Sequence, residues 1–150
     1  MPQSLARISI HLIFSTKRRA PILTDAIRSD FHAYAAAVLR NFGCPADTIN
    51  SVEDHVHILF ELSRTRTIAD VVEEVKKATS KWIKTRGPAF ASFAWQAGYG
   101  AFAVSASNCD EVRQYIAEQR EHHRRRTFQE EYLAFLGRHG LAFDDQYVWD

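Results

Sequence analysis

The chain has 150 residues, of which 46% are hydrophobic, so it can bury a substantial core and is expected to form one domain over residues 1–150. Its two cysteines lack CxxC spacing, no apolar run approaches the ~20 residues of a membrane span, and the N-terminal segment lacks a signal-peptide core. These features exclude a disulfide scaffold and a membrane partner and favour the cytoplasm. The formal net charge of +1 excludes binding to a polyanion through overall charge, so any such binding must depend on local clusters.

The first half of the chain contains alternating and helical patterns in a readable order. Residues 7–16 alternate between apolar and polar side chains, which predicts a strand with one buried face. Residues 24–43 have a helical apolar stripe and end at a glycine, which is typical of a helix. Residues 46–55 and 55–62 then read as two strands joined by a turn. Thr67 can cap a following helix over residues 68–87.

The second half continues with an aromatic and glycine-containing stretch at residues 92–106, which reads as a strand or hairpin. Residues 108–126 predict a helix, and residues 127–150 predict a short C-terminal helix, closed by Gly140, and a tail. The order βαββαβ predicts an α+β fold, a ferredoxin-like sandwich with a four-stranded antiparallel sheet and helices on one face. The other face is expected to be open, with additional C-terminal helices beyond this unit.

Two histidines, His55 and His57, alternate with the apolar residues of the strand at 55–62. Strand geometry places their side chains on one face, about 6 to 7 Å apart, which suits two imidazoles that converge on one metal ion. His11 of the first strand is expected to face the same open side. The spacing alone also fits two solvated histidines on a strand, so a metal site needs further ligands.

The helix at residues 108–126 offers candidates for those ligands. Tyr115 and Gln119 are four residues apart, about 40° around a helix, and His122 continues the same stripe. Arginines surround this stripe, so it does not resemble a core face. A tyrosine packed at the helix edge beside ordinary polar residues is the alternative interpretation.

Five segments, taken together, closely resemble the IS200/IS605 family of single-tyrosine (Y1) transposases. They are "HVHILFEL", "TIADVVEEVKKATSKWI", "FAWQAGYGAFAVS", "QYIAEQ" and "FLGRHGLAFDDQYVWD". By this resemblance His55 and His57 match the histidine pair of the family's HUH motif (His, hydrophobic residue, His), and Gln119 matches the amide ligand of its metal site. Tyr115 matches the nucleophile, and Mg²⁺ or Mn²⁺ is the implied metal.

The resemblance also implies an activity and partners. A transposase of this family cleaves and rejoins single-stranded DNA through a 5′-phosphotyrosine intermediate, with metal assistance, to excise and integrate an insertion sequence. The implied partners are single-stranded DNA with hairpin ends and a second copy of the chain. In such a homodimer each active site combines the histidines of one subunit with the tyrosine helix of the other.

Basic residues outside this constellation are candidates for DNA binding, because Lys and Arg neutralise phosphates. A solvated charged face is the alternative interpretation of each cluster. His122 and His11 are possible accessory residues of the active site. The DNA-binding candidates are Lys17, Arg18 and Arg19 after the first strand, Lys77, Lys81 and Lys84 on the second helix, and Arg120.

Three other functions fit parts of the pattern. The closest is a domesticated tyrosine transposase associated with repetitive palindromes, or another HUH endonuclease. A non-catalytic RRM-like module that binds nucleic acid shares the βαββαβ order, but it should carry aromatic residues where this chain has His11, His55 and His57. A metal-dependent hydrolase that activates water would need a carboxylate cluster, which the sequence does not display.

Overall fold

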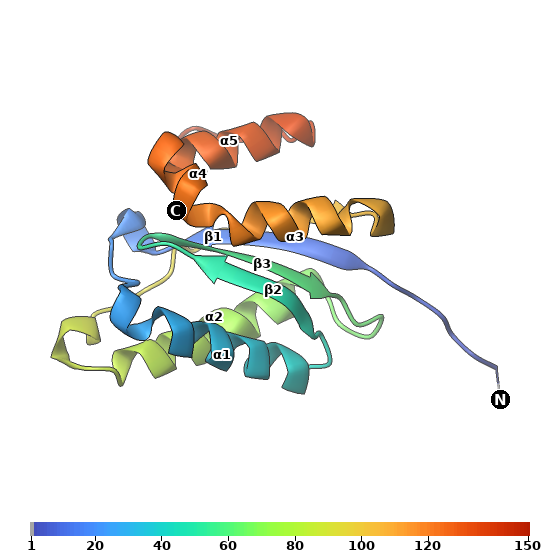
Figure 1. Cartoon of the computed structure of the whole chain (residues 1–150), viewed down its shortest axis with the longest axis horizontal. Coiled ribbons are helices and arrows are strands. Elements are labelled where there is room, and N and C mark those ends of the chain that lie inside the picture. Colours follow the sequence, from blue (N-terminus) through green and yellow to red (C-terminus); the bar gives the residue numbers. More distant parts are fainter. Residues whose placement is uncertain (1) are drawn as a thin grey trace.

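Residues 9–104 form an antiparallel sheet of four strands with two helices on one face (Figure 1). The computed structural model describes residues 2–150. The strands lie in the order β2-β3-β1-β4, with all three pairs antiparallel, so the predicted ferredoxin-like arrangement is confirmed. In chain order the elements are β1 (Ser9–Ser15), α1 (Asp25–Asn41), β2 (Ala46–Ser51), β3 (His55–Glu61), α2 (Ile68–Lys84) and β4 (Gly100–Val104).

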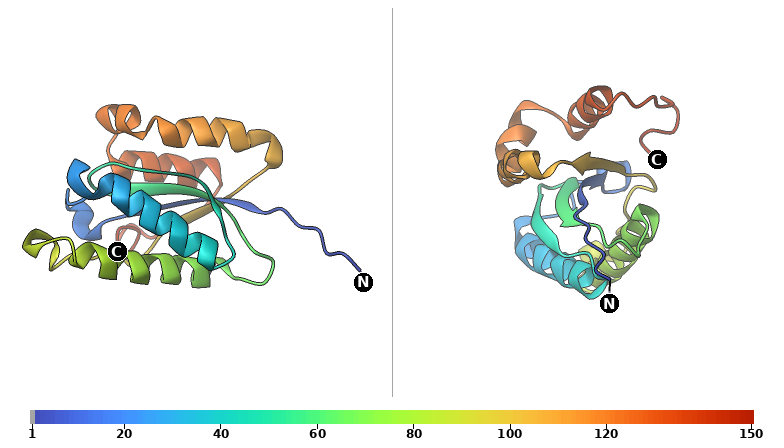
Figure 2. Two further views of the ribbon diagram at one scale, coloured as in Figure 1. Left: turned by 60° about the horizontal axis from the view of Figure 1, so that its bottom comes forward. Right: turned by 90° about the vertical axis from the view of Figure 1, so that its right-hand side faces the viewer.

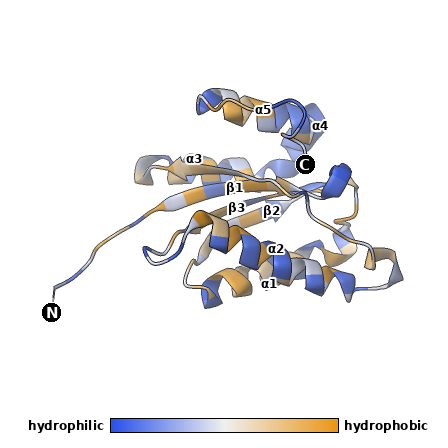
Figure 3. Cartoon of the chain, turned by 180° about the vertical axis from the view of Figure 1, so that it is seen from behind, coloured by the Kyte–Doolittle hydropathy of each residue, from blue (hydrophilic) through white to orange (hydrophobic). Residues whose placement is uncertain are grey.

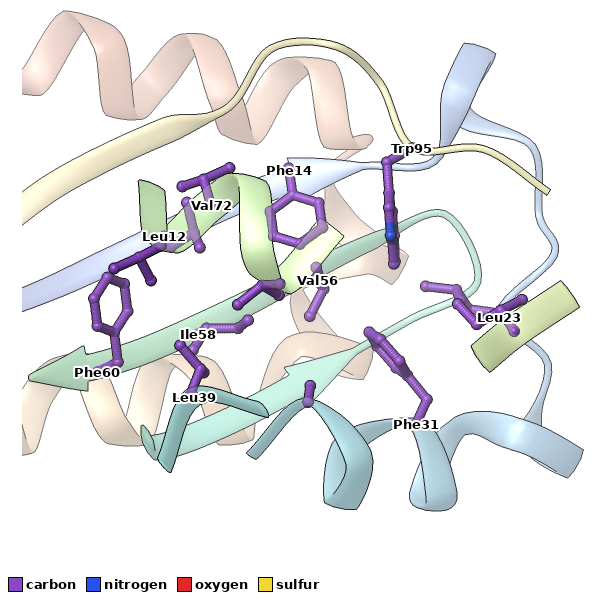
Figure 4. Close-up of a cluster of buried hydrophobic side chains, with 14 of the residues drawn as sticks. Leu12, Phe14, Leu23, Phe31, Leu39, Val56, Ile58, Phe60, Val72 and Trp95 are labelled. Carbon is purple, nitrogen blue, oxygen red and sulfur yellow. The ribbon is translucent and has the colours of Figure 1, made fainter. Parts of the chain in front are cut away.

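The main core lies between this sheet and helices α1 and α2. Alternate residues of β1 and β3 point into it and meet apolar side chains of both helices, as Figure 4 shows. Burial of these side chains drives formation of the two layers. The Thr67 side chain accepts a hydrogen bond from the Asp70 backbone N–H at 3.1 Å, so the predicted cap of α2 is confirmed. The core includes Leu12, Phe14, Phe31, Leu39, Ile58, Phe60 and Val72.

The second face of the sheet is covered, so the prediction of an open face was wrong. Helices α3 (Cys109–Ala117), α4 (Gln119–Arg125) and α5 (Phe128–Arg138) lie on the side opposite α1 and α2 (Figures 1 and 2). The physical reason is a second apolar cluster, in which Ile13 of β1 is completely buried against α5. Its other buried members are Phe102, Phe128, Tyr132, Phe135 and Leu136.

The single helix predicted over residues 108–126 is broken. Glu118 leaves helical geometry, with φ −97° and ψ 20°, and separates α3 from α4. Helix α4 is short and hydrophilic (Figure 3). The break turns the chain so that α5 can return across the sheet, while Gln119 remains next to the turn that carries Tyr115.

The C-terminal segment folds as predicted into a short helix and a tail. Thr127 and Glu130 form a reciprocal capping box at the start of α5, and Gly140 adopts a positive φ of 64° after its end. The tail then returns to the segment before β4, where the Gly98 N–H donates to the Asp150 carbonyl oxygen at 2.7 Å. None of the helices in residues 2–150 is both long and apolar enough to cross a membrane.

Candidate active site and metal centre

The two histidines of β3 lie on the second face of the sheet, beneath the C-terminal helices. They are 1% and 0% exposed, so the prediction that they face solvent was wrong, for the same reason that the face itself is covered. The ring centroids of His55 and His57 are 5.3 Å apart, as expected for side chains two residues apart on a strand. The pair is therefore buried and preorganised by the strand.

Each of these histidines is oriented through its Nδ1 atom. The Asp54 carboxylate accepts a hydrogen bond from His55 Nδ1 at 2.7 Å. His11 Nε2 and His57 Nδ1 share a hydrogen bond of 2.8 Å, so the predicted accessory residue His11 lies next to the pair. Such contacts fix ring orientation in metal sites, and they leave both Nε2 atoms directed at one place.

The structure brings Gln119 and Tyr115 of the same chain to this place. The Gln119 side chain is completely buried, and its Oε1 lies 3.2 Å from His55 Nε2. The Tyr115 ring centroid is 5.9 Å from that of His57, and the ring stacks on His122 at 4.2 Å. One chain therefore assembles both histidines, the amide and the tyrosine without a partner subunit.

Glu131 of α5 completes the cluster, and sequence reasoning missed it. Its Oε1 accepts from His57 Nε2 at 2.8 Å and lies 3.2 Å from His55 Nε2, while its Oε2 accepts from the Tyr115 hydroxyl. Glu131 is 3% exposed. The available signal was its position on the apolar stripe of α5, three residues after Phe128 and four before Phe135, where a carboxylate is costly without a partner.

The buried charges shift the pKa values of these groups in different directions. Burial lowers the pKa of His55, but hydrogen bonds to Asp54 and Glu131 outweigh it and raise that pKa to about 9. Burial lowers the pKa of His57, which favours the neutral imidazole. Burial also raises the pKa of Glu131, but His55 and His57 outweigh it and lower that pKa. Burial and the Glu131 charge raise the pKa of Tyr115 and keep the phenol protonated.

The donor atoms fit a small divalent cation. Ligands about 2.1 Å from an octahedral ion lie about 3.0 Å from their neighbours. Glu131 Oε1 is 2.8 and 3.2 Å from the two imidazole Nε2 atoms, and Gln119 Oε1 is 3.2 Å from His55 Nε2. Two nitrogens with carboxylate and amide oxygens suit Mg²⁺ or Mn²⁺. The residues present therefore match the predicted metal.

Access to this cluster is open on the tyrosine side. Tyr115 is half-buried and lines a cavity of about 190 Å³ together with His11 and Arg138. Arg138 is exposed at the end of α5, which brings a positive charge to the mouth of the cavity. An anionic group that enters here meets the tyrosine and a guanidinium together.

The basic residues after β1 line a larger cavity. Lys17, Arg18 and Arg19 form a 3-10 turn, η1, which borders a cavity of about 570 Å³ with Trp149 as one wall. Arg18 and Arg19 have positive φ values of 57° and 56°, an unfavourable conformation for residues with a side chain. Cations beside an exposed aromatic ring are suited to a nucleotide chain.

The other basic candidates lie elsewhere. Lys77, Lys81 and Lys84 belong to α2, in the helical layer across the sheet from Tyr115. Arg120 is exposed on α4 and forms an ion pair with Asp25 at 3.0 Å. The structure thus separates the α2 lysines from the tyrosine, whereas η1 follows directly from the end of β1 that pairs with His55.

Comparisons with known proteins agree with this fold and site. Residues 4–119 match the family model described as "Transposase IS200 like". The ISDra2 transposase TnpA of Deinococcus radiodurans is 22% identical over 120 residues, which span 77% of this chain and 86% of that protein.

Two solved structures share the fold. A crystal structure of a transposase from D. radiodurans R1 has a TM-score of 0.62 and 22% identity, over 79% of this chain and 98% of the other. A REP-associated tyrosine transposase bound to a REP hairpin has a TM-score of 0.60 and 14% identity, over 82% and 73% of the two chains.

Fold and site together define a single-tyrosine transposase of the HUH type. More particularly, because the family model covers most of its length, the chain belongs to the IS200-like transposase family, as its resemblance to the IS200/IS605 transposases implied.

Proposed function

We propose that the protein cleaves and rejoins single-stranded DNA through a covalent 5′-phosphotyrosine at Tyr115, with assistance from a divalent metal ion. The observation that carries the proposal is the position of the Tyr115 hydroxyl. It belongs to one hydrogen-bonded cluster with Glu131, whose other oxygen contacts His57. A nucleophile beside a set of metal-ligating atoms is the arrangement that transfer of a phosphodiester requires.

The proposed step exchanges one phosphodiester for another. The Tyr115 oxygen attacks the phosphorus atom, the bond from phosphorus to the 3′-oxygen breaks, and the leaving strand ends in a 3′-hydroxyl. The phenol loses a proton and the leaving oxygen gains one, so no proton is consumed overall. The tyrosyl ester keeps the energy of the broken bond, which allows a 3′-hydroxyl to reverse the step and join strands.

His55, His57 and Gln119 would hold Mg²⁺ or Mn²⁺, which when bound supplies positive charge to the scissile phosphate. Without it the chain keeps Tyr115 unreactive, since burial and the neighbouring Glu131 carboxylate raise the pKa of the phenol. Arg138 can bind a phosphate oxygen at the mouth of the Tyr115 cavity. His122, stacked on the Tyr115 ring, limits its rotation and is proposed as an accessory residue.

Single-stranded DNA with a hairpin is the proposed substrate, in line with the solved structure of a REP-associated transposase bound to a REP hairpin. Lys17, Arg18 and Arg19 are the proposed phosphate contacts nearest the site, and Trp149 offers a ring for stacking. Arg120 and the α2 lysines are proposed as further contacts along a longer DNA. A homodimer remains part of the proposal, but one chain already contains the histidines and the tyrosine.

Two alternatives differ in what the structure says of them. Excision of an insertion sequence and action at repetitive palindromes use the same site, so the DNA that is cleaved distinguishes them. A non-catalytic RRM-like module would bind nucleic acid on the second face of the sheet. That face is buried under α3 and α5, which disfavours this function.

The test is incubation with hairpin-bearing single-stranded DNA and Mg²⁺ or Mn²⁺, followed by a denaturing gel that resolves a protein–DNA adduct. We expect an adduct with the wild-type chain, none with Tyr115→Phe, and retained DNA binding by that variant. Tyr147→Phe, which changes an exposed tyrosine in the C-terminal tail, is the matched control and should form the adduct. An adduct that persists in Tyr115→Phe would refute the assignment of the nucleophile.

A further inference from the structure

Glu131 is the one charged residue of α5 in the buried cluster, and it lies beyond residue 119, where the match to the family model ends. The histidine pair and Gln119 account for three donors without it. A role for Glu131 therefore has to be argued from its own contacts.

The first argument is the cost of burying a carboxylate. An ionised carboxylate at 3% exposure is strongly destabilising unless cations or several hydrogen bonds surround it. Its partners are two imidazoles and one phenol, and burial favours the neutral form of His57. A divalent ion among these donors would supply the missing positive charge.

The second argument is position. Glu131 Oε1 lies 2.8 Å from His57 Nε2 and 3.2 Å from His55 Nε2, so it occupies the point on which both imidazoles converge. One ligand atom from each of these three residues lies within 4.8 Å of the others. These separations are near the spacing of adjacent ligands around an octahedral Mg²⁺ or Mn²⁺ ion, about 3.0 Å.

The third argument is rigidity. Glu131 is placed by α5, which is anchored on the sheet through Phe128, Tyr132 and Phe135 on either side of it in sequence. The Phe135 ring lies 5.1 Å from His11 and 5.6 Å from Tyr115, so the helix is packed against the site itself. A carboxylate held this way is a fixed part of the site rather than a mobile surface group.

From these observations we infer that Glu131 is a carboxylate ligand of the metal through Oε1 and positions the Tyr115 hydroxyl through Oε2. This inference rests on the proposed function, since it adds a fourth donor to the same metal site. The complete donor set is two imidazole nitrogens, one amide oxygen and one carboxylate oxygen. Because the carboxylate is negative, it strengthens binding of a hard cation and ties the nucleophile to the ion through one side chain.

The inference is tested by Mn²⁺ binding to the whole chain, measured from the EPR signal of free Mn²⁺ without any DNA. We expect Glu131→Gln, which keeps the shape and can still contact Tyr115, to weaken Mn²⁺ binding at least about tenfold. Glu121→Gln is the matched control. It removes the same charge from an exposed site on α4, where Glu121 pairs with Arg124 and Arg125, and should leave binding unchanged.

The outcomes separate the inference from the proposed function. Equal Mn²⁺ affinity in Glu131→Gln and wild type, with loss in His57→Ala, would overturn the role of Glu131 and leave the histidine site standing. No Mn²⁺ binding by the wild-type chain would overturn the metal site as a whole. Loss in both variants, with the control unchanged, supports the inference.

A second measurement on the wild-type chain covers the case in which Glu131→Gln does not fold. The carboxyl carbon of Glu131 is observed by NMR in ¹³C-labelled protein while Mn²⁺ is added at substoichiometric amounts. A bound paramagnetic ion should broaden the Glu131 signal at the lowest Mn²⁺ concentration and leave Glu121 sharp. A Glu131 signal that stays as sharp as that of Glu121 would contradict direct ligation.

Discussion

Replacement of Phe128 by alanine should release α5 from the sheet and leave the main core intact. Phe128 is 1% exposed, and its ring lies 5.2 Å from Tyr132 and 5.0 Å from His55. Replacement of a buried Phe by Ala costs about 3 to 5 kcal/mol. Because Phe128 opens the first turn of α5, where neighbours can relax into the cavity, we expect the lower value, about 3 kcal/mol.

The assay is native-state amide hydrogen exchange. A loss of about 3 kcal/mol in the docking of α5 raises the population of its undocked form by about 10²-fold, and amides of α5 should exchange faster by that factor. Amides of α1 and α2 should not change, since their core lies on the opposite face of the sheet. Leu133→Ala is the control on the same helix, because Leu133 is 37% exposed and should shift exchange only about twofold.

Two results would refute this reasoning. Uniform acceleration in α1, α2 and α5 would mean that both apolar clusters unfold as one cooperative unit. Unchanged exchange in α5 would mean that Phe128 contributes little to its docking, in spite of its burial. The same experiment in the presence of Mn²⁺ should slow exchange in α5, if Glu131 is a ligand, since a bound ion stabilises the docked form.

Three further predictions concern other parts of the structure. His11→Phe removes a hydrogen bond from the metal-site pair and should weaken Mn²⁺ binding about 10- to 100-fold, while His139→Phe, at an exposed position, should not. Asp47 binds Arg113 at 2.7 Å, which lowers its pKa to about 2, so the bridge stabilises the fold above the usual value of 3.8 and is lost as the pH falls towards 2. The difference in Tm between wild type and Asp47→Asn should therefore shrink over this range, and a constant difference would contradict the assignment. Alanine at residues 17–19 should lower the slope of log affinity for single-stranded DNA against log salt by about one per lost phosphate contact, and an unchanged slope would place the DNA elsewhere.

The sheet and its first helical layer were predictable because alternation and helical spacing are local signals. Leu12 and Phe14 point to one face of β1, and the helices that cover them carry their own apolar stripes. The second layer was harder to predict, since the other face of β1 and β3 carries His11, His55 and His57, which a strand pattern assigns to solvent. Ile13, completely buried on that face, was the residue that pointed to a cover.

Within the site, the residues on regular elements were predictable and the residue set by tertiary packing was not. Two histidines on one strand and a tyrosine four residues before a glutamine have fixed spacing, so their convergence could be expected. Glu131 is 74 residues from His57, and no local period relates the two. The break at Glu118 was also missed, because helix propensity does not reveal where α5 requires the chain to turn.

The position of α5 determines how DNA can reach the site. His55, His57, Gln119 and Glu131 are all buried in the part of the chain that the structure describes, whereas Tyr115 opens onto a cavity lined by Arg138. A scissile phosphate must therefore approach past Arg138 and meet Tyr115 before it meets the histidines. Contact with them then requires the Tyr115 hydroxyl to leave Glu131, since that carboxylate separates the phenol from both imidazoles. The residue that completes the donor set thus also keeps the nucleophile in place until the phosphate arrives.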